Sequence, residues 1–174
     1  MNPRPAGAED KPLGQWIGTA NTTSLLEHWA DVADLGARAW LFQEARCKGS
    51  EGDELLRLSG WTALWSQPEE DGNSLAAIAV QRGHLGKVAL PFLNDKWASR
   101  VVAGLWAPDG GRPILLVSIY GVSSPTTADR EQLNAIVLEI MDLAASKGAV
   151  GCCMGGDFNC VAAELPAAGW LQAC

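Results

Sequence analysis

The sequence predicts an α/β protein in which two packed, mostly antiparallel sheets carry helices on their outer faces. The first observation behind this prediction is a series of short apolar segments bounded by glycine, proline and polar turns, a pattern typical of buried strands. The second is that these segments are too numerous for one small sheet, while two amphipathic helices interrupt them. We expect strands at residues 15–21, 37–44, 61–67, 74–82, 85–92, 99–107, 112–121 and 148–154.

The first half of the chain alternates between strand-like and helix-like segments. The capping-box pattern SLLE at residues 24–27 follows the first strand and predicts a helix through about Leu35, which Gly36 can end. A looser helix is expected near residues 53–58, after the second strand. These helices would cover one face of the predicted sheets.

The second half begins with a run of neighbouring strands between residues 74 and 121. Their connections are short and contain glycine, proline or Asp-Gly-Gly, so we expect the strands to run antiparallel. One clear helix follows, which Thr126 or Thr127 can cap and Gly148 can end. Its apolar face is predicted from the spacing of Leu133, Ile136, Val137, Ile140, Met141 and Ala144.

The composition describes one folded domain. The chain has 174 residues, 48% of them hydrophobic, and a mean hydropathy of +0.03, values typical of a globular protein with a sizeable core. Residues 1–13 are polar and rich in proline and glycine, so we expect a flexible leader followed by a domain at 14–174. No apolar run approaches the roughly 18 residues that span a bilayer. Without an export signal, we expect an intracellular location, nucleus or cytoplasm, and reduced cysteines.

The net charge and the counts of histidine and cysteine bear on two classes of function, tight binding of nucleic acid and binding of structural zinc. A formal net charge of −7 counts mildly against a protein that grips nucleic acid tightly, because phosphate neutralisation supplies most of that affinity. It is compatible with an enzyme that holds a phosphoester weakly while cutting it. The chain has only two histidines and no C-x-x-C pair, so a structural zinc site is not expected.

Polar side chains follow several of the predicted strands at the point where each strand ends. Asn21 ends the first strand, Glu44 ends the second, and Tyr120 lies near the end of the strand before the long helix. The segment MGGDFNC places Asp157 and Asn159 after a short apolar strand and two glycines. If these strands run in the same sense within packed sheets, their ends converge on one patch.

Such a patch suits metal-assisted hydrolysis of a phosphate ester. Mg²⁺ prefers oxygen ligands and is often held by one or two carboxylates, and phosphoryl transfer depends on positioning and charge neutralisation. In this hypothesis Glu44 holds the metal and Asp157 orients or deprotonates the attacking water. Asn21 and Asn159 hold phosphate oxygens or the water, and Tyr120 stabilises charge on the phosphate. Taken singly, each residue has a plainer interpretation as a loop acid, a turn cap or a packing residue.

These motifs resemble the endonuclease/exonuclease/phosphatase family. The resemblance is carried by ANTTSL, WLFQEARCKG, LVSIYGVSSP and GGDFNC, in the order of the chain from about residue 15. It is closest to the endonuclease domains of non-LTR retrotransposons. It implies a four-layer α/β sandwich, Mg²⁺ or Mn²⁺ as cofactor, and phosphodiester or phosphomonoester hydrolysis. Carried over by position, it also implies that Glu44 is the metal carboxylate and Asp157 the water-orienting acid.

The same resemblance implies phosphate- or water-contacting roles for Asn21, Asn159 and Tyr120. Two departures from the family pattern stand out. The glycine that usually follows the first asparagine is replaced by the threonine and serine residues 22–24. The family's later Ser-Asp-His segment has no counterpart before Cys174, so we expect the fold to be incomplete at its carboxyl end.

Three functions follow as hypotheses. The first is a divalent-metal-dependent phosphodiester hydrolase, a retrotransposon-type endonuclease fragment acting on DNA with weak or no activity as it stands. The second is a degenerate remnant or interaction module that is not an enzyme. The third is an inositol or nucleotide phosphatase on the same fold, which the acidic net charge fits slightly better.

Overall fold

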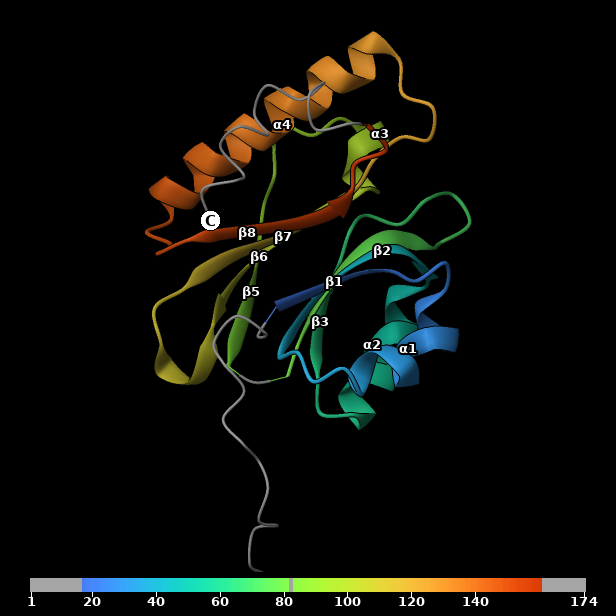
Figure 1. The fold of residues 1–174 in the computed structure, drawn as a ribbon, viewed down its shortest axis with the longest axis vertical. Coiled ribbons are helices and arrows are strands. Elements are labelled where there is room, and N and C mark those ends of the chain that lie inside the picture. The colour runs from blue at the N-terminus through green and yellow to red at the C-terminus, as the bar shows by residue number, and fades with distance from the viewer. Residues whose placement is uncertain (1–16, 82, 161–174) are drawn as a thin grey trace, which may run out of the picture.

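The computed structural model describes residues 17–81 and 83–160, which form two sheets packed face to face (Figure 1). The first sheet has the strand order β1-β2-β4-β3 and the second β5-β6-β7-β8. The strands are β1 (Ile17–Asn21), β2 (Ala39–Cys47), β3 (Thr62–Trp65), β4 (Ser74–Val80), β5 (His84–Val88), β6 (Val101–Ala107), β7 (Ile114–Tyr120) and β8 (Cys152–Asp157). The helices are α1 (Leu25–Ala33), α2 (Gly49–Leu58), α3 (Asp95–Ala98) and α4 (Thr127–Ser146), with a 3-10 turn at Pro108–Gly110. The predicted leader, residues 1–13, lies outside the described residues.

Two strand pairs are parallel, and they bring the ends of four strands to one end of the molecule. β1 pairs with β2, with Asn21 opposite Gln43, and β7 pairs with β8, with Tyr120 opposite Asp157. The other neighbouring strands are antiparallel. Parallel pairing requires a crossover connection, which α1 supplies between β1 and β2 and α4 supplies between β7 and β8.

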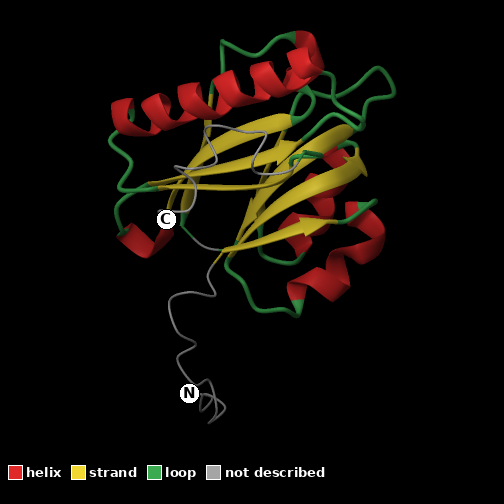
Figure 2. Cartoon of the chain, turned by 45° about the horizontal axis from the view of Figure 1, so that its top comes forward, coloured by secondary structure: helices red, strands yellow, loops and turns green. Residues whose placement is uncertain are grey.

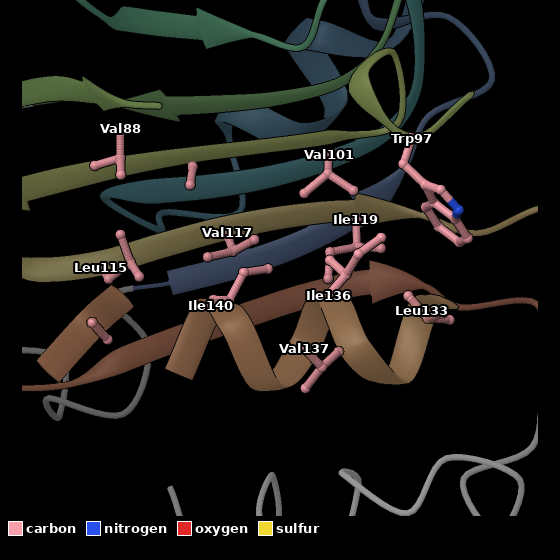
Figure 3. Packing of buried hydrophobic residues seen from close by; sticks show 12 residues of the cluster. Val88, Trp97, Val101, Leu115, Val117, Ile119, Leu133, Ile136, Val137 and Ile140 are labelled. Atoms are coloured by element: carbon pink, nitrogen blue, oxygen red, sulfur yellow. The ribbon is translucent and has the colours of Figure 1, made fainter. Parts of the chain in front are cut away.

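Helices cover the outer face of each sheet, so the molecule has four layers (Figure 2). On the first sheet, the Trp29 ring of α1 meets the rings of Trp61 and Phe42 edge-on, at centroid distances of 5.1 and 6.2 Å. On the second, Ile136 and Ile140 of α4 pack against the apolar face of β7 (Figure 3). The predicted fold class, two packed sheets with outer helices, is therefore confirmed.

A third apolar cluster fills the space between the two sheets. Its buried members are Ala39, Leu41, Ala76, Ile78, Val80, Leu85, Val102, Trp106 and Leu116. The first sheet is therefore apolar on both of its faces. Successive residues of β2 and β4 point alternately toward the helices and toward the opposite sheet, because side chains alternate along a strand. Within the part of the chain that the structure describes, no helix is long and apolar enough to cross a bilayer.

The predicted N-terminal cap forms at α4 but not at α1. Thr126 caps α4 as predicted: its hydroxyl accepts from the backbone N–H of Asp129, and the Asp129 carboxylate accepts from the backbone N–H of Thr126. Ser24 is the N-cap residue of α1, but its side chain makes no capping bond, so the predicted capping box does not form there. Gly36 and Gly148 follow α1 and α4 with φ values of 79° and 65°, a region open to glycine.

Several predicted strands have different limits in the structure, and two of these differences affect the predicted site residues. β2 does not end at Glu44 but continues to Cys47 through an irregular register. The last predicted strand, residues 148–154, is shifted: β8 begins at Cys152 and includes both glycines and Asp157. Every β8 residue is half-buried rather than fully buried, because among the described strands β8 has a sheet neighbour, β7, on one side only.

Candidate active site

Side chains from the two parallel pairs form three layers between the sheets, because residues two apart on a strand share a face. The innermost layer is apolar and consists of Ile17, Leu41, Leu116 and Cys153. The next layer is hydrogen-bonded and consists of Thr19, Gln43, Ser118 and Gly155. The outermost layer consists of Asn21, Glu44, Tyr120 and Asp157. Four of the five predicted site residues therefore lie at the mouth of the interface between the sheets.

The outermost layer is one hydrogen-bonded cluster. Asn21 Nδ2 donates to Glu44 Oε1 and to Asp157 Oδ2, at 3.2 Å in each case. Tyr120 donates its hydroxyl to Glu44 Oε1 at 3.0 Å. The second carboxylate oxygen of Glu44 lies 3.2 Å from the Arg46 guanidinium. The structure thus brings together four of the five residues singled out from the sequence, from four strands and both sheets.

A β-bulge turns Glu44 into this cluster. On a regular strand Gln43 and Glu44 would face opposite sides of the sheet. The β2–β4 register shifts between Gln43 and Cys47, and Glu44 and Arg46 adopt φ values of 52° and 42°. Left-handed backbone at residues other than glycine costs free energy and collects at functional sites. Thr23, in the turn that follows Asn21, also has a positive φ, of 56°.

The glycine pair before Asp157 lets β8 approach its neighbours closely. A Cβ on Gly155 would lie 2.8 Å from Leu41 Cδ1 and 3.0 Å from Thr19 Oγ1, both on the first sheet. A Cβ on Gly156 would lie 2.5 Å from the carbonyl oxygen of Ile119. Only glycine fits both positions without movement, so the pair sets how near Asp157 comes to β1, which lies beside β8 (Figure 1).

Asn159 lies next to the cluster but its amide points elsewhere. Its backbone N–H donates to Asp157 Oδ1 at 3.1 Å and so restrains this oxygen, while the other oxygen, Oδ2, faces Asn21. Its side-chain Nδ2 donates to the carbonyl oxygen of Gly121, also at 3.1 Å. Asn159 therefore joins the end of β8 to the end of β7, in a left-handed conformation with φ 51°.

Cys47 and the two histidines do not supply a nucleophile or base to the cluster, whose own reactive groups are the oxygen atoms of the carboxylates and the phenol. Burial, followed by the negative charges of Glu51 and Asp53, raises the pKa of the Cys47 thiol to about 12. The thiol is therefore neutral near pH 7 and a poor nucleophile, although it belongs to the same strand as Glu44. His28 pairs with Asp31 on α1, and His84 begins β5 opposite Ala107, so neither described histidine joins the cluster.

The donor set of the site fits Mg²⁺ or Mn²⁺. Glu44 and Asp157 converge on one amide nitrogen, and Arg46 already places a positive charge on Glu44. Among residues 17–81 and 83–160, no group of three or more His, Cys, Asp or Glu side chains is arranged to hold a metal ion. Carboxylate oxygens completed by water are typical ligands of Mg²⁺, whereas Zn²⁺ is usually bound by nitrogen and sulfur ligands.

Four residues around the cluster were not predicted as site residues. Gln43 and Ser118 are buried beneath it, and Arg46 binds Glu44 from the rim. The Arg100 guanidinium lies 5.1 Å from the centre of the Tyr120 ring and donates to Gly121 O. A signal for the buried pair was present in the sequence: each is a polar residue at a position that alternation assigns to the interface between the sheets.

The fold is that of known proteins. A 3′ phosphatase from Neisseria, NExo, solved with a product DNA hairpin, matches with a TM-score of 0.61 and 22% identity over 82% of this chain and 57% of that chain. The endonuclease domain of TRAS1, a telomere-specific non-LTR retrotransposon, matches with a TM-score of 0.52 and 20% identity over 82% and 58%. An endonuclease/exonuclease/phosphatase from Beutenbergia cavernae matches with a TM-score of 0.54 and 12% identity over 82% and 46%.

The chain therefore has the endonuclease/exonuclease/phosphatase fold, as the sequence motifs predicted. It spans about half the length of these solved structures. No protein-family model and no curated protein sequence matches the chain.

Proposed function

We propose that the cluster is the site of a divalent-metal-dependent phosphodiester hydrolase of the retrotransposon endonuclease type, with DNA as its substrate. The observation that carries this proposal is the position of Asn21 Nδ2, within 3.2 Å of a carboxylate oxygen of both Glu44 and Asp157. The uncharged Asn21 amide holds the two carboxylates close together, so the site is negatively charged. A divalent cation can bind to these carboxylates and in turn bind a substrate phosphate.

In this proposal Glu44 would hold Mg²⁺ or Mn²⁺, with Asp157 facing the same point. When bound, the ion supplies the positive charge that neutralises the phosphate. Asp157 orients the attacking water and accepts its proton at Oδ2, while the Asn159 N–H keeps Oδ1 fixed. Asn21 and Tyr120 donate hydrogen bonds to phosphate oxygens, exchanging their present bonds to Glu44 for bonds to the substrate.

Asn159 is proposed as a second amide contact to phosphate or water. Its Nδ2 donates to Gly121 O, so this role requires the amide to share or exchange that bond. We expect hydrolysis by the 174-residue chain to be slow, because no described histidine reaches the cluster to donate to the phosphate or activate the water.

Binding of Mn²⁺ to the full chain, measured by calorimetry, is the first test. Glu44→Gln removes the carboxylate charge with little change in shape and should weaken binding at least about tenfold. Glu139→Gln, an exposed position on α4, is the matched control and should bind as the wild type does. Equal binding by the wild type and Glu44→Gln contradicts the proposal, and absence of binding favours a non-catalytic remnant or interaction module.

Hydrolysis is the second test. Plasmid DNA, RNA and phosphoinositides are incubated with the chain and Mg²⁺ or Mn²⁺, with EDTA as the blank. We expect slow metal-dependent nicking of DNA that Asp157→Asn abolishes. Metal-dependent cleavage of DNA that survives Asp157→Asn would remove that residue from the mechanism.

A second candidate function, a phosphatase for nucleotides or inositol phosphates, is favoured by one feature beside the cluster. A cleft of about 710 Å³ is bounded by Arg100, which also lies on the Tyr120 ring. Its charged lining residues are Glu69, Glu70, Asp71, Asp95, Lys96 and Arg100. Four acids and two bases disfavour a long polyanion, and Arg100 is the lining base through which a single phosphate could reach the cluster, because its guanidinium lies on the Tyr120 ring. Release of phosphate from small substrates, without nicking of DNA, would select this candidate.

A further inference from the structure

Gln43 makes hydrogen bonds to four strands from a buried position between the sheets. Its side chain is 2% exposed, and its Nε2 lies 3.0 Å from both Leu41 O and Ser118 Oγ. The same nitrogen lies 3.5 Å from Gly155 O, and its Oε1 accepts from Thr19 Oγ1 at 3.1 Å. Ser118, fully buried, accepts from Gln43 and donates to Phe42 O at 2.6 Å. One carboxamide thus connects β1, β2, β7 and β8.

Each member of this bridge stands directly inward of a residue of the cluster. The inward–outward pairs along the strands are Thr19 and Asn21, Gln43 and Glu44, Ser118 and Tyr120, and Gly155 and Asp157. Three of the pairs are two residues apart on one strand, so backbone movement of the inner residue is passed to the outer one. The fourth pair is adjacent across the bulge.

Hydrogen bonds specify the offset between the sheets more strictly than apolar packing does. Leu41 and Leu116, one layer deeper, tolerate small sliding of one sheet over the other, since dispersion contacts have no direction. A buried carboxamide has fixed donor and acceptor directions, and leaving either unpaired costs free energy. The polar layer therefore fixes the sheets at the depth where the cluster begins.

We propose that Gln43 is a positioning residue, whose hydrogen-bonded bridge between the sheets holds Asn21, Glu44, Tyr120 and Asp157 at their mutual distances. Its importance for hydrolysis rests on the function proposed above, whereas its effect on the geometry of the cluster does not. Gln43 touches none of these four side chains in the contacts that the structure gives, so it acts through the strands that carry them.

The single tyrosine of the chain gives a direct probe of the cluster. Tyrosine labelled with ¹³C at Cζ produces one NMR signal, which reports the hydrogen bond from Tyr120 to Glu44. Gln43→Met keeps the length of the side chain and removes its hydrogen bonds. We expect this variant to fold, to move the Tyr120 signal, and to weaken Mn²⁺ binding about tenfold.

Val80→Ala is the control for loss of stability alone. Val80 is 1% exposed between the sheets and pairs with Ala39 and Thr62, at the opposite end from the cluster. The variant should unfold at lower urea concentration than the wild type and leave the Tyr120 signal and Mn²⁺ affinity unchanged. Ser118→Ala removes only the hydroxyl oxygen, and with it the hydrogen bonds to Gln43 and Phe42. It should move the Tyr120 signal in the same direction as Gln43→Met, to a smaller extent.

The outcomes separate this inference from the proposed function. A Tyr120 signal unchanged in both Gln43→Met and Ser118→Ala overturns the positioning role, as does an equal change in Val80→Ala. If Gln43→Met does not fold, Ser118→Ala decides alone. A wild-type chain that binds no Mn²⁺ overturns the proposed function, while the tyrosine signals of the variants still decide whether Gln43 positions the cluster.

Discussion

Asn21 and Asp157, which are 136 positions apart in the sequence, are joined by a hydrogen bond of 3.2 Å from Asn21 Nδ2 to Asp157 Oδ2. The bond crosses from β1 in the first sheet to β8 in the second. The same nitrogen binds Glu44, so one amide keeps two carboxylates apart and facing a common point. Neutral donors between like charges lower their mutual repulsion, which makes Asn21 the electrostatic centre of the cluster.

Replacing that amide by a third carboxylate should destabilise the protein in a way that a divalent cation reverses. We expect Asn21→Asp to lower the free energy of unfolding by about 0.5–1 kcal/mol near pH 7, because two hydrogen bonds at an exposed position become like-charge contacts. Mg²⁺ should restore most of the loss by binding the folded state. Urea unfolding with and without Mg²⁺ measures both effects.

Gln81→Glu is the matched control for Asn21→Asp. It adds the same charge at an exposed position after β4, at the other end of the sheets. It should change the free energy of unfolding by less than about 0.5 kcal/mol and show no greater response to Mg²⁺ than the wild type. Equal stability losses in the two variants would contradict a close approach of Asn21 to the acids.

Arg46 forms an ion pair with Glu44 and would therefore compete with a metal ion for this carboxylate. Its guanidinium lies 3.2 Å from Glu44 Oε2, and its side chain is about half exposed, so removing it should change stability by no more than about 1 kcal/mol. We expect Arg46→Met to bind Mn²⁺ several times more tightly than the wild type, because the variant removes the positive charge that competes with the ion for Glu44. Arg57→Met, on the exposed side of α2, should leave the affinity unchanged. Weaker binding in Arg46→Met would instead show that Arg46 holds Glu44 in place for the metal.

The meeting of the strand ends could be predicted from the sequence. Asn21, Tyr120 and Asp157 each end an apolar segment, and a helix connects β1 to β2 and β7 to β8. A strand–helix–strand unit pairs its strands in parallel, so both carboxyl ends lie on one side. Alternation then gives the face on which each side chain stands.

The exact path of the backbone around Glu44 could not be predicted. Nothing in FQEARC indicates that Glu44 and Arg46 adopt positive φ, since neither residue type favours that region. The bulge is held by contacts from distant segments, namely Asn21, Tyr120 and the partner strand β4. The direction of the Asn159 amide, toward Gly121, likewise depends on a residue 38 positions away.

Gly156 should be far less replaceable than Gly151, although both belong to the same stretch of chain. A Cβ at Gly156 would lie 2.5 Å from the backbone oxygen of Ile119, whereas one at Gly151 meets nothing within 4 Å. We expect Gly156→Ala to lose about 1–3 kcal/mol of stability as β8 moves away from β7. Gly151→Ala should stay within about 0.5 kcal/mol of the wild type in urea unfolding. Equal effects would show that β8 does not lie this close to β7.

The start of α4 should make part of the protein's stability depend on acid. Hydrogen bonds from Lys96 and then from Thr126 lower the pKa of Asp129 from 3.8 to about 2. Because the folded pKa lies below the ordinary value, this stabilisation is present above about pH 4 and is lost as the pH falls through 2. Asp129→Asn should therefore be less stable than the wild type at pH 6, and the difference should shrink toward pH 2. Asp142→Asn, exposed on the same helix, is the control and should follow the wild type throughout. Urea midpoints measured from pH 6 to pH 2 decide the matter, and a constant difference between Asp129→Asn and the wild type would show that the carboxylate charge does not stabilise this helix end.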